Sequence, residues 1–163
     1  MATFDTKKLL AESSASPITD TYAIWATADI VVFHITIDWW PRTWGSPTYN
    51  WVALTQAWTA QSSWDEWYAE IWYMINPLTW IKDINIPNTW TQNVQVAISS
   101  YISALGGFAV DAVAQTSATS TNPTVSVTPT TTAWFIVDSL FTGYRNAVTA
   151  NNRTLLYAQK ACK

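Results

Sequence analysis

Charged side chains are scarce in this chain. They make up 12% of its 163 residues, whereas ordinary globular domains carry about 25%. The single cysteine, Cys162, and the single histidine, His34, exclude a disulfide framework and a zinc cluster built from these ligands. The chain also lacks a Gly-rich phosphate loop, a Gly-x-Ser-x-Gly motif and a His-Glu-x-x-His motif. We therefore expect no enzymatic activity, no bound metal and no cofactor.

Long apolar runs are missing as well. The most apolar stretch, residues 22–40, is interrupted by Asp29, His34 and Asp38. A spanning helix needs about 18 or more consecutive apolar residues, and the chain has no such run. We therefore expect no membrane span.

Tryptophan, by contrast, occurs 12 times, and aromatic residues make up 15% of the chain. A single small core holds only a few indoles, so the remaining ones are expected at the surface or between chains. Interface cores are enriched in aromatic residues and depleted in charge, and large exposed apolar patches mark interaction surfaces. The composition favours a subunit that assembles with copies of itself. A monomer with a crowded core is the alternative.

The apolar pattern predicts a mainly α fold, an antiparallel four-helix bundle with a small β element near the N-terminus. The β element covers residues 22–40, in which one strand face carries Val31, Phe33, Ile35, Ile37 and Trp39. A short extended piece follows at 78–87. The four helices are expected to begin at Thr48 or Asn50, at Ser62 or Ser63, at Asn88 or Thr89, and at about Ala133.

The chain is expected to hold one domain between two terminal segments. Residues 1–21 are interpreted as a polar N-terminal arm, 22–150 as the bundle with its β element, and 151–163 as a C-terminal tail. Residues 115–132 form a long Ser/Thr-rich loop between helices 3 and 4. Loops of this length are usually functional or disordered.

Glu70 is the most informative acid. Three interpretations are open for Glu70 and its neighbours Asp65 and Glu66: a solvated helix face, a subunit interface or a catalytic group. In an interface, a facing carboxylate would raise one pKa and favour assembly at low pH. We assign to a subunit interface a set of one acid and four aromatic residues: Glu70, Trp72, Trp67, Trp64 and Trp58.

Basic residues gather near the chain ends, and Lys82 is the one basic residue between Thr43 and Tyr144. The basic patch typical of nucleic-acid readers is therefore missing. Backbone N–H groups at a helix start near Thr132 could still meet phosphates. We assign to a nucleic-acid-facing loop four polar residues: Asn122, Thr124, Thr130 and Thr132.

Five short motifs occur in the order found in one known family. They are Tyr68–Trp72 (aromatic-x-Glu-x-Trp), Ile86-Pro87, Ala104–Phe108, Asn122–Thr124 and Asn152–Thr154. In this order they resemble the coat proteins of tobamovirus-like, rod-shaped plant viruses. The resemblance covers residues 39–157. It implies a four-helix bundle whose inner loop lies next to packaged RNA, in a subunit found in virions and in host cytoplasm during assembly.

The chain also departs from that family. Where the family has arginines after the loop glycine, this chain has 109–113, which contains none. The family's second assembly carboxylate would fall near Ile98 or Ser99, and neither is acidic. The resemblance implies a self-assembling coat subunit of a rod or filament with RNA as its cargo. The alternative is a Trp-rich glycan- or membrane-binding module that uses platforms such as Trp39, Trp40 and Trp44.

Overall fold

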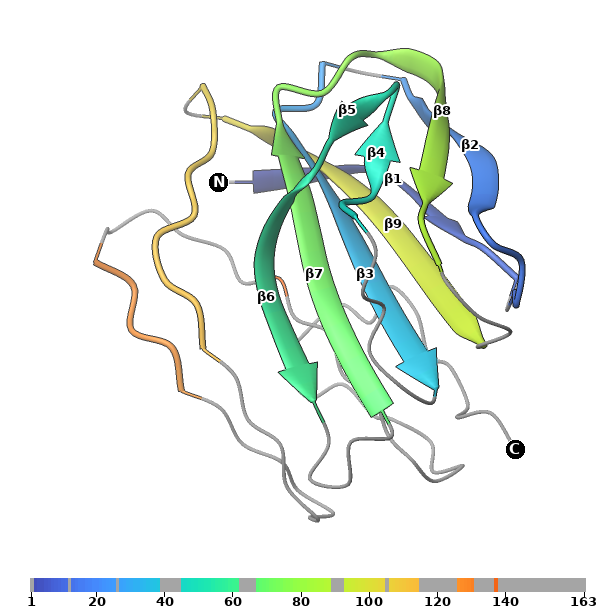
Figure 1. The fold of residues 1–163 in the computed structure, drawn as a ribbon. Coiled ribbons are helices and arrows are strands. Elements are labelled where there is room, and N and C mark those ends of the chain that lie inside the picture. Colours follow the sequence, from blue (N-terminus) through green and yellow to red (C-terminus); the bar gives the residue numbers. More distant parts are fainter. Residues whose placement is uncertain are drawn as a thin grey trace.

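The described part of the chain is all β in a computed structural model (Figure 1). The structure describes residues 2–11, 13–25, 27–38, 45–61, 67–88, 93–104, 106–114, 126–130 and 137, with the backbone alone for residues 38, 58–61 and 67. Within these residues, nine strands form two sheets in which every neighbouring pair is antiparallel.

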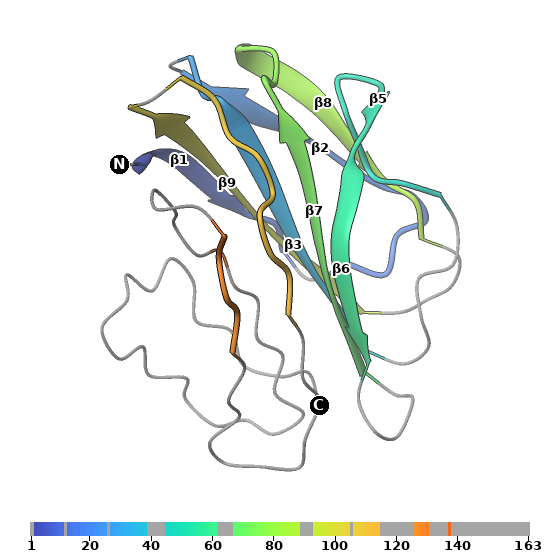
Figure 2. The ribbon, with the colours of Figure 1, turned by 90° about the vertical axis from the view of Figure 1, so that its left-hand side faces the viewer.

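The two sheets are stacked face to face (Figures 1 and 2). The five-stranded sheet contains, in spatial order, β1 (Ala2–Leu9), β9 (Val94–Ser103), β3 (Ile30–Asp38), β7 (Trp67–Ile75) and β6 (Thr55–Gln61). The four-stranded sheet contains, in spatial order, β2 (Ile18–Ile24), β8 (Trp80–Ile86), β4 (Thr48–Tyr49) and β5 (Val52–Ala53).

The chain crosses repeatedly between the sheets. β1, β3, β7 and β9 lie in one sheet, whereas β2, β4, β5 and β8 lie in the other. This is the strand order of a jelly roll, in which two Greek keys form a double-sheet sandwich. β6 is an additional edge strand that follows β5 after the buried Leu54.

The core lies between the sheets and follows a two-residue alternation. In β3 the side chains of Val31, Phe33, Ile35 and Ile37 are fully buried, which confirms the strand face predicted for them. The other strands place further apolar residues in the same interior: Tyr22 and Ile24 of β2, Tyr49 of β4, Ile84 and Ile86 of β8, and Val94, Val96 and Ile98 of β9.

The predicted four-helix bundle is wrong. The segments predicted as helices 1 to 3 contain β5, β6, β7 and β9. Their apolar residues fit the helical period, but they also alternate at the strand period, and valine, isoleucine and aromatic residues favour strands. The predicted fourth helix, at 133–150, lies outside the described residues apart from Val137.

The predicted polar arm, residues 1–21, contributes a strand to each sheet. β1 pairs with β9 along nearly its whole length, and β2 begins at Ile18. The stretch 22–40 was expected to form one β element, but it supplies strands to both sheets, with β2 ending at Ile24 and β3 beginning at Ile30. The short extended piece expected at 78–87 is β8. The predicted tail lies outside the described residues.

Polar side chains buried near β1 connect the sheets. The Tyr22 hydroxyl donates to the Thr6 carbonyl over 2.8 Å and lies 3.2 Å from Ser100 Oγ. The Ser100 hydroxyl in turn donates to Asp5 Oδ2 over 2.8 Å. Because buried polar groups are costly unless they are paired, this network fixes β2 against β1 and β9.

Candidate functional site

One end of the four-stranded sheet carries an exposed apolar surface. β2 runs antiparallel to β8, so it ends where β8 begins. Trp25 follows β2 directly and Trp80 opens β8, and the backbones pair at Ile24 and Trp80. Trp25 and Trp80 are 67% and 69% exposed.

We call this surface the tryptophan rim and define it by four residues: Trp25, Leu78, Trp80 and Ile81, all exposed. The Tyr49 hydroxyl holds the backbone of the rim in place. It donates a hydrogen bond to the Leu78 carbonyl over 2.8 Å, and the Trp80 carbonyl lies 3.4 Å away. Burial of this phenol raises the pKa of Tyr49 to about 12, so it remains a donor over the physiological range.

Two exposed tryptophans have left-handed backbone. Trp80 has φ of 72° and Trp51 has φ of 66°. A bulky residue in this region is an outlier, and such strain costs about 1–3 kcal/mol. Asn50 and Trp51 are the two loop residues of the β4–β5 hairpin, both with positive φ, where Asn-Gly is the usual pair. Trp51 therefore occupies a position that favours glycine.

A cleft of about 270 Å³ lies on the outer face of the four-stranded sheet. Six of its lining residues come from β2, β8, β4 and the hairpin: Thr19, Thr21, Thr48, Trp51, Asp83 and Asn85. On β8 the buried Ile84 and Ile86 alternate with Asp83 and Asn85, so the latter two side chains point away from the core. Trp51, 75% exposed, adds an apolar indole to this polar lining.

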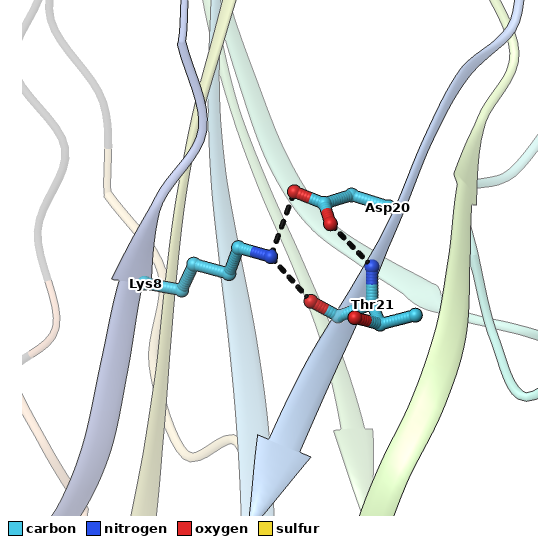
Figure 3. Close-up of polar contacts among 3 residues, drawn as sticks. All are labelled: Lys8, Asp20 and Thr21. Atoms are coloured by element: carbon cyan, nitrogen blue, oxygen red, sulfur yellow. Dashed lines mark hydrogen bonds and ion pairs between the residues drawn. The ribbon is translucent and has the colours of Figure 1, made fainter.

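A polar clasp joins the two sheets at the edge next to the cleft (Figure 3). The Lys8 ammonium of β1 contacts Asp20 Oδ2 at 2.7 Å and donates to the Thr21 carbonyl over 2.6 Å. The Thr21 backbone N–H donates to Asp20 Oδ1 over 2.7 Å. Burial alone would raise the pKa of Asp20, but the hydrogen bonds from Lys8 and Thr21 and the charge of Lys8 lower it overall.

Two members of the predicted subunit interface lie between the sheets. Glu70 is 3% exposed and Trp72 is 7% exposed. The Trp72 Nε1–H donates to Glu70 Oε2 over 2.6 Å. Trp58 and Trp67 are strand residues described by backbone alone, and Trp64 lies outside the described residues. The structure brings Glu70 and Trp72 together inside one chain, and the interface assignment stays a prediction.

Of the predicted nucleic-acid-facing residues, the structure describes only Thr130. Its backbone N–H donates to Asp111 Oδ2 over 2.6 Å, and its hydroxyl donates to Asp111 Oδ1. The other three, Asn122, Thr124 and Thr132, lie outside the described residues. The nucleic-acid-facing role of the loop stays a prediction.

His34 lies on the outer face of β3, where its backbone is flanked by Ile71 and Ala97. Burial lowers the pKa of His34 to about 4, so the imidazole is neutral at physiological pH. Within the described residues, no group of three or more His, Cys, Asp or Glu is placed to hold a metal ion. The described residues also include no helix long and apolar enough to cross a membrane.

Sequence reasoning missed both the cleft and the hairpin beside it. It took Thr48 or Asn50 as the start of the first helix, which would place Trp51 within that helix. The available signal was the pair Asn50-Trp51 between two stretches of strand-forming residues, because asparagine is a common first residue of a two-residue hairpin loop. Tryptophan in place of glycine hid that signal.

Comparison with known proteins found no protein family, no curated protein and no solved structure that matches this chain.

Proposed function

We propose that this chain is a self-assembling structural subunit whose copies associate through the tryptophan rim. The observation that carries the proposal is the exposure of tryptophan. Of the four tryptophans whose side chains the structure describes, only Trp72 is buried, and two of the other three, Trp25 and Trp80, lie at the adjoining ends of β2 and β8.

The size of the rim supports an interaction surface. If a tryptophan offers ~250 Å², Trp25 and Trp80 together leave roughly 340 Å² uncovered at their 67% and 69% exposure. Leu78 and Ile81 enlarge this area. Exposed apolar patches of ~300–600 Å² are the largest on typical monomers and are often functional.

The chemistry of the rim favours a second copy as the occupant. The rim residues are uncharged, and interface cores are depleted in charge and enriched in aromatic residues. The chain has few charges with which to keep such a surface solvated. The jelly-roll fold does not by itself distinguish between functions, since it occurs in shell-forming subunits, in lectins and in cupins.

The proposal no longer includes the helical-bundle geometry of a rod-shaped coat, because the described fold is all β. It also does not require RNA as cargo, because Lys82 is the one basic residue between Thr43 and Tyr144. Assembly alone is the proposed function.

Sedimentation velocity at increasing protein concentration, with negative-stain electron microscopy of the same samples, tests the proposal. We expect concentration-dependent growth for the unaltered chain. The variant Trp25→Lys/Trp80→Lys should associate at least about tenfold more weakly, since both changes put charge into an apolar contact. The matched control Val110→Lys changes an exposed apolar residue outside both sheets and should associate normally.

Two results would contradict the proposal. A chain that remains monomeric up to millimolar concentration does not assemble. A rim variant that is folded by circular dichroism and associates like the unaltered chain would show that any assembly uses another surface.

A further inference from the structure

We propose that the cleft beside Trp51 is a glycan-binding site for a neutral sugar chain. The cleft shares no residue with the tryptophan rim, so this inference goes beyond self-assembly. It rests on the chemistry of the lining and on the placement and backbone conformation of Trp51.

The lining offers hydrogen-bonding groups suited to hydroxyls. Thr19, Thr21 and Thr48 supply hydroxyls that donate and accept, and Asn85 supplies an amide with both functions. Asp83 adds an exposed carboxylate that accepts only. Since a sugar hydroxyl is both donor and acceptor, this mixture matches a polyhydroxylated ligand better than an apolar one.

The charge of the lining selects against anions. Its two acidic residues are Asp20 and Asp83, and no basic residue lines it. The Asp20 carboxylate is already paired with the Lys8 ammonium, which reaches it from β1 (Figure 3). A phosphate, sulfate or uronic acid would meet the Asp83 carboxylate, while the Lys8 ammonium beside the lining is already paired with Asp20. A neutral glycan meets no such penalty.

Trp51 supplies the apolar half of sugar recognition. One face of a pyranose ring is lined by C–H groups that pack against an aromatic surface, while the hydroxyls bond to polar neighbours. The hairpin fixes the backbone of Trp51 at one end of the cleft, where the Asn50 N–H donates to the Asp83 carbonyl over 2.8 Å. An indole side chain has only two χ angles to order on binding, so it provides a large contact area at a low entropic cost.

The strained backbone of Trp51 is independent support. Glycine would satisfy the hairpin without strain, yet the chain has its bulkiest side chain there, 75% exposed. Such outliers cluster at functional positions. A volume of about 270 Å³, just below the ~300–1,000 Å³ of ligand pockets, suits one sugar unit of a longer chain that lies across the sheet.

The clasp holds β2 in place for this ligand. Lys8 bonds to the Thr21 carbonyl, and Asp20 lies between Thr19 and Thr21 in sequence. The two threonines therefore belong to an edge strand that is fixed to the other sheet. Lys8 and Asp20 are positioning residues here and need not touch the sugar.

The test titrates the full chain with four neutral hexasaccharides: cellohexaose, maltohexaose, mannohexaose and N-acetylchitohexaose. Calorimetry and tryptophan fluorescence report binding. We expect saturable binding of at least one of them, weakened about tenfold or more in Trp51→Ala and in Asp83→Ala/Asn85→Ala. The control Trp25→Ala removes an exposed indole from the rim and should leave binding unchanged.

Three results would overturn the inference. The first is that none of the four sugars binds at millimolar concentration. The second is that a folded Trp51→Ala variant binds sugar as well as the unaltered chain does. The third is that the chain binds phosphatidylcholine vesicles through Trp51 but binds no sugar. Self-association is measured separately by sedimentation. Failure of one proposal therefore leaves the other standing.

Discussion

Breaking the hydrogen bond between Trp72 and Glu70 should destabilise the fold. The two residues are 7% and 3% exposed, and the Nε1–Oε2 distance is 2.6 Å. A hydrogen bond to a charged group contributes ~1.5–3 kcal/mol, and a buried partner left behind adds a desolvation penalty. We therefore expect Trp72→Phe and Glu70→Met each to lower the free energy of unfolding by about 2–4 kcal/mol.

A double-mutant cycle isolates the bond, because both residues make further contacts. The double variant removes donor and acceptor together, so its loss should be smaller than the sum of the two single losses by about 1.5–3 kcal/mol. Urea unfolding followed by far-ultraviolet circular dichroism gives the four free energies. The m-value should stay constant across the cycle.

The control Glu70→Gln keeps an oxygen acceptor and should lose less stability than Glu70→Met. Additive single losses, with a coupling below about 0.5 kcal/mol, would refute the reasoning. The predicted interface role of Glu70 gives a different result: Glu70→Gln would move the pH midpoint of assembly and leave the unfolding of the single chain unchanged.

Three further predictions concern other parts of the fold. Folding lowers the pKa of His34 from 6.5 to about 4. Between these pH values the unfolded chain binds the proton more readily than the folded chain, so the free energy of unfolding should decrease by about 2–3 kcal/mol as pH falls from 6.5 to 4. Urea titrations should show that His34→Gln removes this decrease. For the clasp, whose side chains are 33% and 38% exposed, Lys8→Met should cost at most about 1 kcal/mol in urea unfolding, and the difference should shrink at high salt. At the hairpin, Trp51→Gly should unfold at higher urea concentration than Trp51→Ala, because φ of 66° strains alanine but not glycine; equal midpoints would contradict the left-handed backbone.

The sequence predicts a strand correctly where the spacing of apolar residues fits the strand period of two and does not also fit the helical period. In β3, Val31, Phe33, Ile35 and Ile37 alternate with polar or less buried residues, and the strand followed from the sequence. In β7 the inward positions are Tyr68, Glu70 and Trp72. A carboxylate among them conceals the alternation, and the helical period then fits the remaining apolar residues equally well.

Pairing between strands that lie far apart in the sequence could not be predicted from local sequence patterns. The segment of β1 contains Lys7 and Lys8 and has no buried stripe, so it predicts a solvated arm. It is a strand because β9, whose paired residues lie 88 to 101 positions away, supplies its hydrogen bonds. The short motifs that resemble those of rod-shaped virus coats carry no such pairing information, and the helical bundle that the resemblance implies is contradicted.

The sequence predicts that tryptophans are exposed on the surface, but it does not predict where they lie. An excess of tryptophan over what one core can hold does predict exposed indoles, and Trp25, Trp51 and Trp80 are exposed. Their positions depend on strand direction, which brings the end of β2 to the start of β8, and on a hairpin that a sequence pattern read as a helix start. Neither is a local property of the chain.

The two outer faces of the sandwich differ in which of the described residues lie over them. On the outer side of the five-stranded sheet lies the segment 106–114 (Figure 2), which Asp111 links to Thr130. Among the described residues, the outer side of the four-stranded sheet carries the cleft, with the rim at one end. Exposed apolar and hydrogen-bonding groups that accompany backbone strain, as at Trp51 and Trp80, favour an external partner. Both proposals therefore fall on the four-stranded sheet, and variants on that sheet test them first.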